Sequence, residues 1–328
     1  MRLLGDRKLT ELAEAYLQEA SERLRPGSYK GVRFAIRLAV SEIGELALRE
    51  ITEDHGRQIL ALIAQLTPNV RKYREARGAG LSRLAKLSRT LNEPPIAAQT
   101  QARIWRHMCE LLEWCVEAGE LIENPWTSLS VRARPEVMPH ASLTDDEVVA
   151  LLGAASGRFW VLIHLCLLSG LRSGEAVGLT QDDLIDKGSL GTFVRVRPNA
   201  VRPLKTRAAE REVPMHRSLE GGLGVGRPQP GNRVFPSWTT DRVVKQFARL
   251  RQETGLERPG LVFHSTRKWF ITQCERSGVP ENFTASLVGH ASARSANRLT
   301  YGIYSAGISD AQKREIVDRL RLPGGCAS

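Results

Sequence analysis

The sequence predicts a mainly α-helical protein of two domains, with a small antiparallel β-sheet in the second domain. Three observations favour this fold class. The 328 residues suffice for two domains of ordinary size. Apolar residues recur at helical spacing through residues 1–130, and residues 192–197 and 211–215 read as two short strands. We expect a helical domain over 1–130, a linker over 131–141 and a second domain over 142–328.

The helices of the first domain follow from stripes of apolar residues three and four positions apart, which give each helix one face for a core. The fourth of these helices is long and covers residues 98–119. The third helix is ended by Thr67 and Pro68. The four stripes are Leu9, Leu12, Ala13, Tyr16 and Leu17; Val32, Ala35, Ile36 and Val40; Ile59, Leu60, Ile63 and Leu66; and Ile104, Trp105, Met108, Leu111, Leu112 and Cys115.

A basic stretch lies between the third and fourth of these helices. Residues 71–89 include seven basic residues and a single acidic residue, Glu75. The seven are Arg71, Lys72, Arg74, Arg77, Arg83, Lys86 and Arg89. Gly78 and Gly80 favour a flexible loop here. Because charge of one sign attracts a polyanion, we interpret the stretch as a contact surface for the DNA backbone, and a solvated loop is the alternative.

The charge of the whole chain also indicates a polyanionic partner. The formal net charge of +11 favours nucleic acid first and an anionic membrane second. The most apolar run, residues 159–168, has about half the length of a membrane span, and the N-terminus has no apolar signal core. Five cysteines show no metal-ligand spacing: Cys109, Cys115, Cys166, Cys274 and Cys326. We expect reduced thiols, no metal site and a cytoplasmic protein.

The second domain opens with a capping box, in which Thr144 and Glu147 begin a helix that runs through Leu152. A buried helix is predicted over 159–169, before the two strands. Further helices are expected over 241–252, 265–277 and 310–320. The C-terminal segment 311–322 is amphipathic, and we interpret it as a helix that docks on a neighbouring subunit; packing on its own domain is the alternative.

The first segment with chemical meaning lies where the buried helix ends at Ser169-Gly170 and Arg172 follows. The core anchors this arginine while the turn exposes it. Its planar guanidinium suits the non-bridging oxygens of a phosphate. Glu175, three residues later, is close enough to orient the guanidinium. Taken alone, the segment is also compatible with a surface salt bridge.

Two further segments carry groups that suit phosphate chemistry. His264 and Arg267 are three residues apart, so they face the same way at the start of a helix, whose N-terminus favours an anion. A third segment ends in a Gly-His pair at His290, and Tyr301 and Tyr304 follow it. Each segment is weak evidence by itself, because an isolated histidine is more often a structural residue.

Together, and in this order, the three segments resemble the signature of tyrosine recombinases of the phage integrase family: an arginine box, a His-x-x-Arg box, a Gly-His box and then a tyrosine. The resemblance covers the second half of the chain. The first half resembles the helical core-binding domain of the family, notably at residues 119–126. The resemblance implies a C-shaped DNA clamp, with Arg172, His264, Arg267 and His290 as catalytic residues around one phosphate.

The resemblance also implies a catalytic lysine in a β-hairpin turn, where Lys205 fits. Arg207 is the alternative, but its high pKa makes it a poor proton donor. The nucleophile is Tyr304 or Tyr301, which follow His290 by 14 and 11 residues, farther than in many members of the family. Tyr304 is favoured because the string Tyr-Gly-Ile-Tyr-Ser resembles a subgroup in which the second aromatic residue attacks.

In the implied mechanism, the two arginines neutralise charge that grows on the phosphate oxygens. The two histidines add hydrogen bonds, and His264 also accepts the tyrosine proton. Lys205 protonates the leaving 5′ oxygen, and Tyr304 is left in a 3′-phosphotyrosyl bond. A 5′ hydroxyl from another strand reverses this step and joins the DNA. The chemistry requires neither a metal nor another cofactor.

The implied partner is double-stranded DNA with inverted half-sites, bound by a homodimer on one site and recombined by a homotetramer in the synapse. Accessory DNA-bending proteins are further candidates, which the sequence does not identify. Two alternatives remain: a type IB topoisomerase, which shares the catalytic residues, and a catalytically inactive DNA-binding relative. The helical first domain favours a recombinase, and the filled catalytic positions favour an enzyme.

Overall fold

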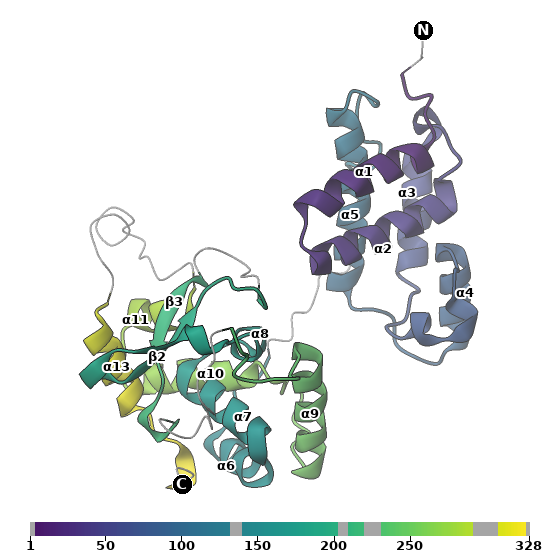
Figure 1. Cartoon of the computed structure of the whole chain (residues 1–328). Coiled ribbons are helices and arrows are strands. Elements are labelled where there is room, and N and C mark those ends of the chain that lie inside the picture. Colours follow the sequence, from purple (N-terminus) through teal and green to yellow (C-terminus); the bar gives the residue numbers. More distant parts are fainter. Residues whose placement is uncertain (1–3, 132–139, 203–208, 220–230, 291–307, 326–328) are drawn as a thin grey trace. The chain divides into compact units, whose positions relative to one another are not determined.

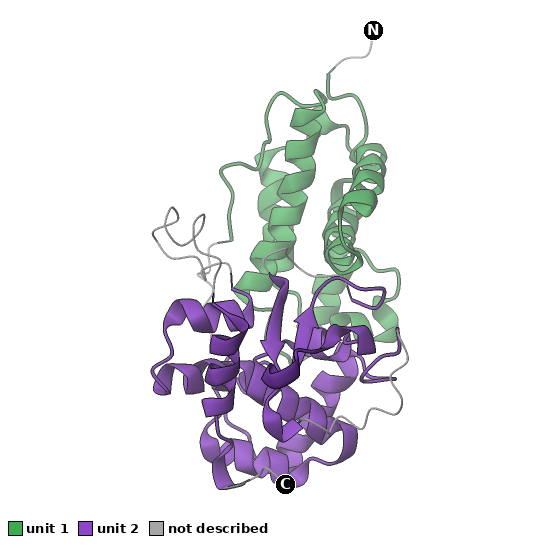
Figure 2. Ribbon diagram, turned by 60° about the vertical axis from the view of Figure 1, so that its left-hand side comes forward, with its two compact units in different colours: residues 1–137 green, residues 138–328 purple. Residues whose placement is uncertain are grey.

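The computed structural model describes residues 4–131, 140–202, 209–219, 231–290 and 308–325. The chain divides into two compact units, residues 1–137 (unit 1) and 138–328 (unit 2), which Figure 2 colours separately. Each unit buries a hydrophobic core of its own, as separate folding bodies do. The C-shaped clamp concerns the placement of the two units on DNA and stays a prediction.

The described part of unit 1 is helical (Figure 1). Its helices are α1 (Leu9–Arg23), α2 (Pro26–Ile43), α3 (Glu53–Ile63), α4 (Leu81–Thr90) and α5 (Ala98–Glu117). Helix α2 contacts each of the other four, so it forms the centre of the unit. The apolar stripes predict the buried faces well, and on α5 all six predicted residues are buried. The mainly helical fold class with one small antiparallel sheet is confirmed.

Trp126 lies near the end of the described part of unit 1 and belongs to its core. Its side chain is 1% exposed and stacks on Trp105 with ring centroids 5.0 Å apart. Its indole Nε1 donates a hydrogen bond of 3.0 Å to the main-chain oxygen of Thr52. A Cβ on Gly56 would lie 2.8 Å from this indole, so α3 approaches the ring closely only because residue 56 is glycine. The segment after α5 is therefore an integral part of the core.

The prediction of a flexible loop over the basic stretch was wrong. The structure forms short 3₁₀ turns at Val70–Lys72 and Arg74–Ala76, followed by helix α4. Helix α4 buries Leu81, Leu84 and Ala85 against unit 1. The apolar stripe of α4 is short, and the many basic residues and two glycines around it favoured a loop in the prediction. Packing against unit 1 stabilises the segment as a helix.

Unit 2 surrounds a three-stranded antiparallel sheet with helices (Figure 1). The strands are β1 (Leu184–Asp186), β2 (Thr192–Val196) and β3 (Arg211–Pro214), in the order β1-β2-β3. The register pairs Val194 with Val213 and Arg195 with Glu212. The two predicted strands are confirmed, whereas β1 was not predicted, because three residues are too short for a recognisable alternation.

The helices of unit 2 place the segments that carry the predicted site. They are α6 (Asp145–Ala154), α7 (Gly157–Ser169), α8 (Ser173–Val177), α9 (Thr240–Glu253), α10 (Ser265–Arg276), α11 (Glu281–Val288) and α13 (Asp310–Arg319). The capping box is confirmed, since the Thr144 hydroxyl accepts from the Glu147 N–H and the Glu147 carboxylate accepts from the Thr144 N–H. Helix α7 packs on α10, and α11 packs on β3, which brings three distant sequence segments together.

The C-terminal helix α13 packs within its own unit, contrary to the expectation that it docks on a neighbouring subunit. Ile316, Val317 and Leu320 belong to the core of unit 2. Arg314 is also buried and donates a hydrogen bond of 2.8 Å to the main-chain oxygen of Met215. The apolar face of α13 that suggested docking is therefore buried in the core of unit 2.

Among the described residues, no helix combines the length and the apolar character that crossing a membrane requires.

Candidate functional site

The turn between α7 and α8 requires a glycine. Gly170 follows α7 in the left-handed conformation, with φ of 63°. A Cβ at this position would lie 2.6 Å from a ring carbon of Phe270. The backbone angle and the lack of space therefore both exclude a larger side chain. Arg172 is the N-cap of α8, so the buried end of α7 determines where its side chain begins.

Glu175 holds Arg172 through both carboxylate oxygens. Its Oε1 accepts a hydrogen bond of 2.7 Å from Nη1 of Arg172, and its Oε2 accepts one of 2.8 Å from the main-chain N–H of Arg172. The Glu175 side chain is 6% exposed and that of Arg172 is 39% exposed. Burial by itself would raise the pKa of Glu175, but bonds and charge from Arg211 and Arg172 outweigh it and lower the pKa to about 2. Arg172 thus rests on an ionised carboxylate and keeps one side open.

Arg267 is buried in the site, with a side chain that is 1% exposed. Its Nη1 donates a hydrogen bond of 2.6 Å to the main-chain oxygen of Gly170, and its Nη2 donates one of 2.5 Å to that of Val288. Burial, followed by repulsion from Arg172 and Arg211, lowers the pKa of Arg267 to about 9, so the group stays charged at neutral pH. This guanidinium joins the turn after α7 to the end of α11.

Arg211 is a member of the site that the sequence did not reveal. It begins β3, and its side chain is 5% exposed. Its Nη2 lies 2.9 Å from Oε2 of Glu175 and its Nη1 lies 3.3 Å from Oε1. Its Nε donates a hydrogen bond of 2.6 Å to the main-chain oxygen of Leu287. An arginine that begins a buried strand was the available signal, but such a signal does not identify a partner 36 residues away.

His264 and His290 lie beside the arginines at the surface of the unit. His264 directly precedes α10, and His290 follows α11, where its N–H donates to the main-chain oxygen of Ala285 at 3.0 Å. Partial burial, followed by the positive charge of Arg267, lowers the pKa of both rings. A neutral imidazole has one donor and one acceptor nitrogen, so each ring can donate to an anion or accept a proton.

The remaining predicted catalytic residues lie outside the described residues. They are Lys205, its alternative Arg207, and the two candidate nucleophiles Tyr301 and Tyr304. The other four predicted residues and the supporting Glu175 converge on one side of unit 2, where their charges influence one another.

The charges of this cluster favour an anion. Three guanidinium groups, on Arg172, Arg211 and Arg267, surround a single carboxylate, so the cluster has a net positive charge. Because the cluster is largely shielded from water, charge-assisted hydrogen bonds are stronger there than at an open surface. With neutral imidazoles beside it, the arrangement can bind one phosphate group and exchange a proton next to it.

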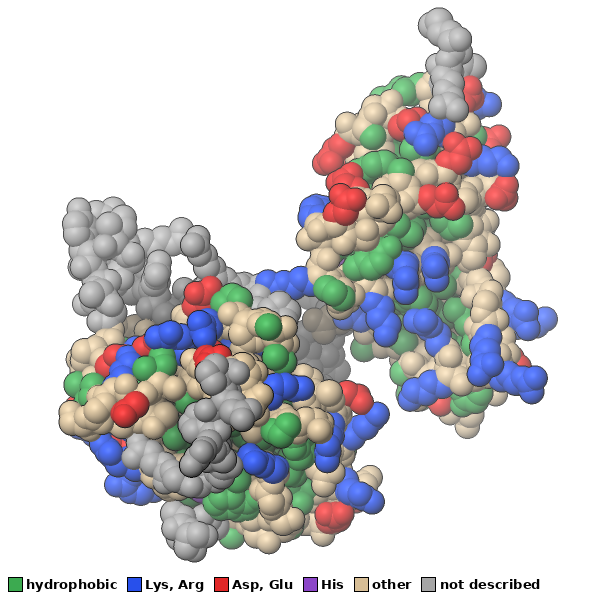
Figure 3. Space-filling model, viewed as in Figure 1, with side chains coloured by type: hydrophobic (Ala, Val, Ile, Leu, Met, Phe, Trp, Pro, Cys, Tyr) green, Lys and Arg blue, Asp and Glu red, His purple; other side chains and the backbone are tan. Residues whose placement is uncertain are grey.

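A second cationic region lies on unit 1, and we call its seven residues the α4 surface: Arg71, Lys72, Arg74, Arg77, Arg83, Lys86 and Arg89. All seven are exposed, and within the described part of the chain none has an ion-pair partner. In Figure 3, basic side chains gather around α4, whereas acidic side chains predominate at the opposite end of the unit on this face. The guanidinium of Arg71 lies 4.5 Å from the centre of the Phe34 ring, which joins the α4 surface to α2. Its charge is therefore concentrated on one side of the unit.

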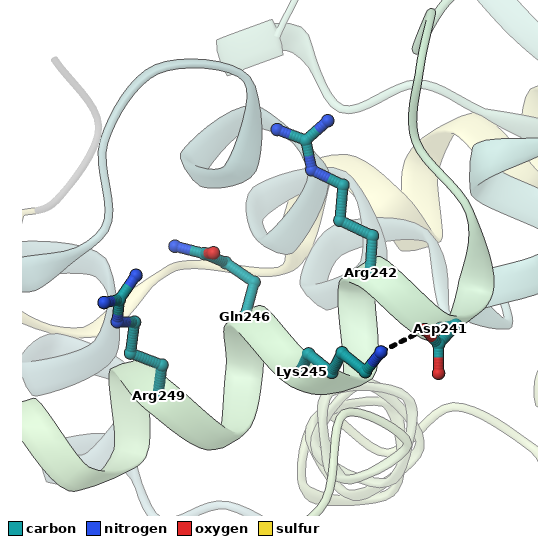
Figure 4. A pocket seen from close by; sticks show the side chains of 5 residues that line it. All are labelled: Asp241, Arg242, Lys245, Gln246 and Arg249. Atoms are coloured by element: carbon teal, nitrogen blue, oxygen red, sulfur yellow. Dashed lines mark ion pairs between the residues drawn. The ribbon is translucent and has the colours of Figure 1, made fainter.

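Helix α9 carries a third set of polar groups, which was not predicted from the sequence. A shallow hollow of about 500 Å³ lies along this helix and is lined by Asp241, Arg242, Lys245, Gln246 and Arg249. Figure 4 shows Arg242, Gln246 and Arg249 projecting from one side of the helix, while Lys245 pairs with Asp241 at 2.7 Å. The spacing of three, four and seven residues was the signal in the sequence for this face.

Comparison with known families and proteins places these features in context. Residues 141–301 match the model of the Phage integrase family. A protein named tyrosine recombinase XerC 2, from Ralstonia nicotianae (strain ATCC BAA-1114 / GMI1000), is 24% identical over 229 residues. That match covers 64% of this chain and 63% of the relative, so the chain spans less than two thirds of the relative's length.

Solved structures of two integrases share the fold. The lambda integrase dimer bound to a COC′ core site has a TM-score of 0.61 and 15% identity, covering 96% of this chain and 79% of that one. The lambda integrase tetramer bound to a Holliday junction has a TM-score of 0.62 and 16% identity, covering 87% and 78%. The Tn1549 transposon integrase in complex with transposon right end DNA has a TM-score of 0.62 and 14% identity, covering 94% and 98%.

Proposed function

The chain belongs to the phage integrase family, and from this membership we propose that it is a site-specific DNA recombinase. It cleaves and rejoins DNA strands through a 3′-phosphotyrosyl intermediate. The observation that supports the proposal most is the cluster of Arg172, Glu175 and Arg267 beside His264 and His290. A phosphodiester resists attack because its anionic oxygens repel a nucleophile, and a preorganised positive site removes that repulsion in the transition state.

The exposure of each side chain supports a division of roles. Arg172 is open to solvent on one side, so its guanidinium contacts the non-bridging oxygens directly. Arg267 is buried, so it contributes positive charge from inside the unit, and its hydrogen bonds fix the turns at Gly170 and Val288. His264 accepts the proton of the attacking tyrosine, and His290 donates a hydrogen bond to the phosphate. Their lowered pKa values keep both rings neutral at pH 7, as these roles require.

The remaining roles rest on the sequence. Tyr304 attacks the phosphorus and releases the 5′ oxygen, which Lys205 protonates; Tyr301 is the alternative nucleophile. The tyrosine oxygen exchanges one phosphodiester bond for another, so the reaction needs no external energy source and no cofactor. A 5′ hydroxyl from a second strand then attacks the phosphotyrosine, which completes the joining step.

Two cationic surfaces supply the contacts with DNA. The α4 surface binds the phosphate backbone through unit 1, because its charges are exposed and have no ion-pair partner among the described residues. The side chains of α9 bind DNA through unit 2, as Arg242, Gln246 and Arg249 combine charge with a neutral amide that can read base edges. We propose that the two units close on the duplex as a C-shaped clamp. The activity takes place in the cytoplasm, where the DNA is accessible.

The assembly follows the solved relatives, which are a lambda integrase dimer on a core site and a tetramer on a Holliday junction. We propose that a homodimer binds inverted half-sites and that a homotetramer exchanges strands in the synapse. Accessory DNA-bending proteins are candidate partners of that synapse.

Covalent capture tests the proposed function. The preferred half-site is first selected from a random-sequence duplex library, and a duplex with this site is nicked next to the cleavage position. Cleavage then releases a short fragment that diffuses away, and the phosphotyrosyl adduct accumulates on a denaturing gel. We expect an adduct with the wild-type chain and none with Arg172→Ala. Selection of a half-site without any adduct would indicate an inactive DNA-binding relative, and relaxation of supercoiled plasmids that lack the site would favour a topoisomerase.

A further inference from the structure

Glu175 is shared between two arginines that have different access to solvent. Arg172, with a side chain 39% exposed, uses Oε1 of Glu175, and Arg211, with a side chain 5% exposed, contacts both carboxylate oxygens. Two arginine side chains are therefore hydrogen-bonded to the carboxylate, one of which faces outward and one of which is enclosed. This asymmetry separates the functions of the two guanidinium groups.

The balance of charge around Glu175 indicates what Arg211 contributes to the site. Without Arg211, the carboxylate of Glu175 would cancel one of the two positive charges of Arg172 and Arg267, whose Nη1 lies 4.0 Å from Oε2 of Glu175. Because Arg211 also pairs with Glu175, the three guanidinium groups and one carboxylate retain two positive charges where they would otherwise retain one, and Arg172 presents its charge at the open side. At the short distances of a buried cluster, one unit of charge has a large effect on an incoming anion.

Arg211 is enclosed, with a side chain 5% exposed, and its hydrogen bonds tie it to the protein instead of to a phosphate. Its Nε donates to the main-chain oxygen of Leu287 at 2.6 Å, and its Nη1 donates to that of Ala209 at 2.9 Å. A Cβ on Gly289 would lie 3.0 Å from Nη1, so the guanidinium packs closely on the turn that precedes His290. The same side chain thus contacts the supports of both Arg172 and His290.

From these contacts we propose that Arg211 is a positioning residue of the recombination reaction, which compensates Glu175 so that the charge of Arg172 is available to the scissile phosphate. The inference rests on the proposed function, because it concerns the same phosphate site. Arg211 acts through Glu175 and through the turn before His290, and it does not touch the DNA.

A double-mutant cycle with a modified substrate tests this proposal. The variants Arg211→Gln, Arg211→Lys, Glu175→Gln and the double variant are compared in single-turnover cleavage of the nicked duplex that carries the selected half-site. A second duplex has a methylphosphonate at the scissile position, where a methyl group replaces one anionic oxygen. Thermal unfolding and DNA affinity are measured for every variant, so that loss of folded protein is separated from loss of chemistry.

Arg258→Gln provides a matched structural control. Glu147 occupies the same capping position in α6 that Glu175 occupies in α8, and Arg258 contacts it through Nε at 2.9 Å and Nη2 at 2.7 Å. This arginine also reaches its carboxylate from a distant element, since the two residues are 111 positions apart in the sequence. We expect Arg258→Gln to lower the melting temperature without changing the cleavage rate of the folded protein.

We expect Arg211→Gln to slow cleavage of the ordinary duplex by about 100-fold, the loss that a missing electrostatic contact in an active site typically causes, with DNA affinity nearly unchanged. Arg211→Lys should retain part of the rate, because it keeps the charge. The double variant should cleave faster than Arg211→Gln, because it removes the carboxylate that otherwise neutralises Arg172. The defect of Arg211→Gln should shrink to less than about 10-fold on the methylphosphonate duplex, whose neutral phosphorus centre depends less on positive charge.

Two results would overturn the proposal for Arg211 while the recombinase assignment stands. One is an equal defect of Arg211→Gln on both duplexes, which would indicate a purely structural effect. The other is a double variant that cleaves no faster than Arg211→Gln. If the wild-type chain itself forms no adduct, the proposed function fails, and the role of Arg211 fails with it.

Discussion

Nη1 of Arg267 lies 2.6 Å from the main-chain oxygen of Gly170, although the two residues are 97 positions apart in the sequence. This bond connects the start of α10 to the turn that carries Arg172, so the first two motif segments are held together by a buried guanidinium. Arg172 itself has no comparable structural role, because its side chain is partly exposed and its partner Glu175 is only three residues away. The two arginines of the signature should therefore respond differently to mutation.

Arg172→Ala should abolish cleavage and leave the melting temperature nearly unchanged. Arg267→Ala should abolish cleavage and also destabilise the fold by about 3 kcal/mol, because it leaves two buried carbonyl oxygens without donors. Thermal unfolding and covalent capture on the nicked duplex measure the two effects separately. Equal melting temperatures for the two variants would contradict the structural role of Arg267, and wild-type cleavage by Arg172→Ala would contradict the assignment of the site.

Tyr304→Phe should bind the selected half-site and form no covalent adduct, because the change removes only the hydroxyl oxygen. Tyr301→Phe is the matched control, three residues away and identical in chemistry, and it should retain much of its activity. Peptide mapping of the trapped adduct identifies the nucleophile directly. An adduct on Tyr301 would exchange the two roles, and an adduct on neither residue would overturn the phosphotyrosyl mechanism.

Replacing four cations of the α4 surface should weaken binding to all DNA sequences alike. The variant changes Arg74, Arg77, Arg83 and Lys86 to glutamine. If all four contact phosphates, fewer counterions are released, and the slope of log K against log salt should fall by about 3 to 4. Titration of fluorescent duplexes at several salt concentrations measures this slope.

The control is a second quadruple variant, which also loses four positive charges, but at residues that form ion pairs with carboxylates. It changes Lys8, Arg49, Arg57 and Arg106, which pair with Glu45, Asp6, Glu53 and Glu110. We expect its salt dependence to stay close to that of the wild-type chain. If both quadruple variants reduce the slope equally, the effect comes from net charge and the α4 surface has no special role.

The cleavage rate should fall in acid with an apparent pKa below 6.5, the ordinary value for histidine. Partial burial and the charge of Arg267 lower the pKa of His264 and His290, so both rings are neutral at pH 7 and become protonated only at lower pH. Protonation removes the base and blocks transfer of the tyrosine proton. Single-turnover rates between pH 4.5 and 8 measure this dependence.

NMR titration of the two imidazole rings provides an independent measurement of the same effect. The resonances are assigned with His264→Asn and His290→Asn, and both rings should titrate below pH 6.5. Arg172→Gln should raise the pKa of both rings, because the charge of Arg172 contributes to both shifts. Titration of either ring at or above 6.5 in the wild-type chain would contradict the electrostatic description of the site.

Local patterns predicted most of the helices because the signals of a helix lie within a few neighbouring residues. The capping box of Thr144 and Glu147 and the inward face of α5 required no knowledge of distant segments. The same reading missed α4, because the charge of the basic stretch and Gly78 and Gly80 suggested a loop. It also missed β1, whose three residues are stabilised by pairing with β2.

The sequence by itself determined the fold class, the family resemblance and the motif residues Arg172, His264, Arg267 and His290, because each of these depends on the identity and order of residues. Only the tertiary structure decided that Arg267 is enclosed while Arg172 is open, and that Arg211 shares the carboxylate of Glu175. These relationships depend on how α7, α10, α11 and β3 pack against one another. Contacts between residues that are 36 or 97 positions apart leave no periodic pattern in the sequence, so they arise only when the core forms.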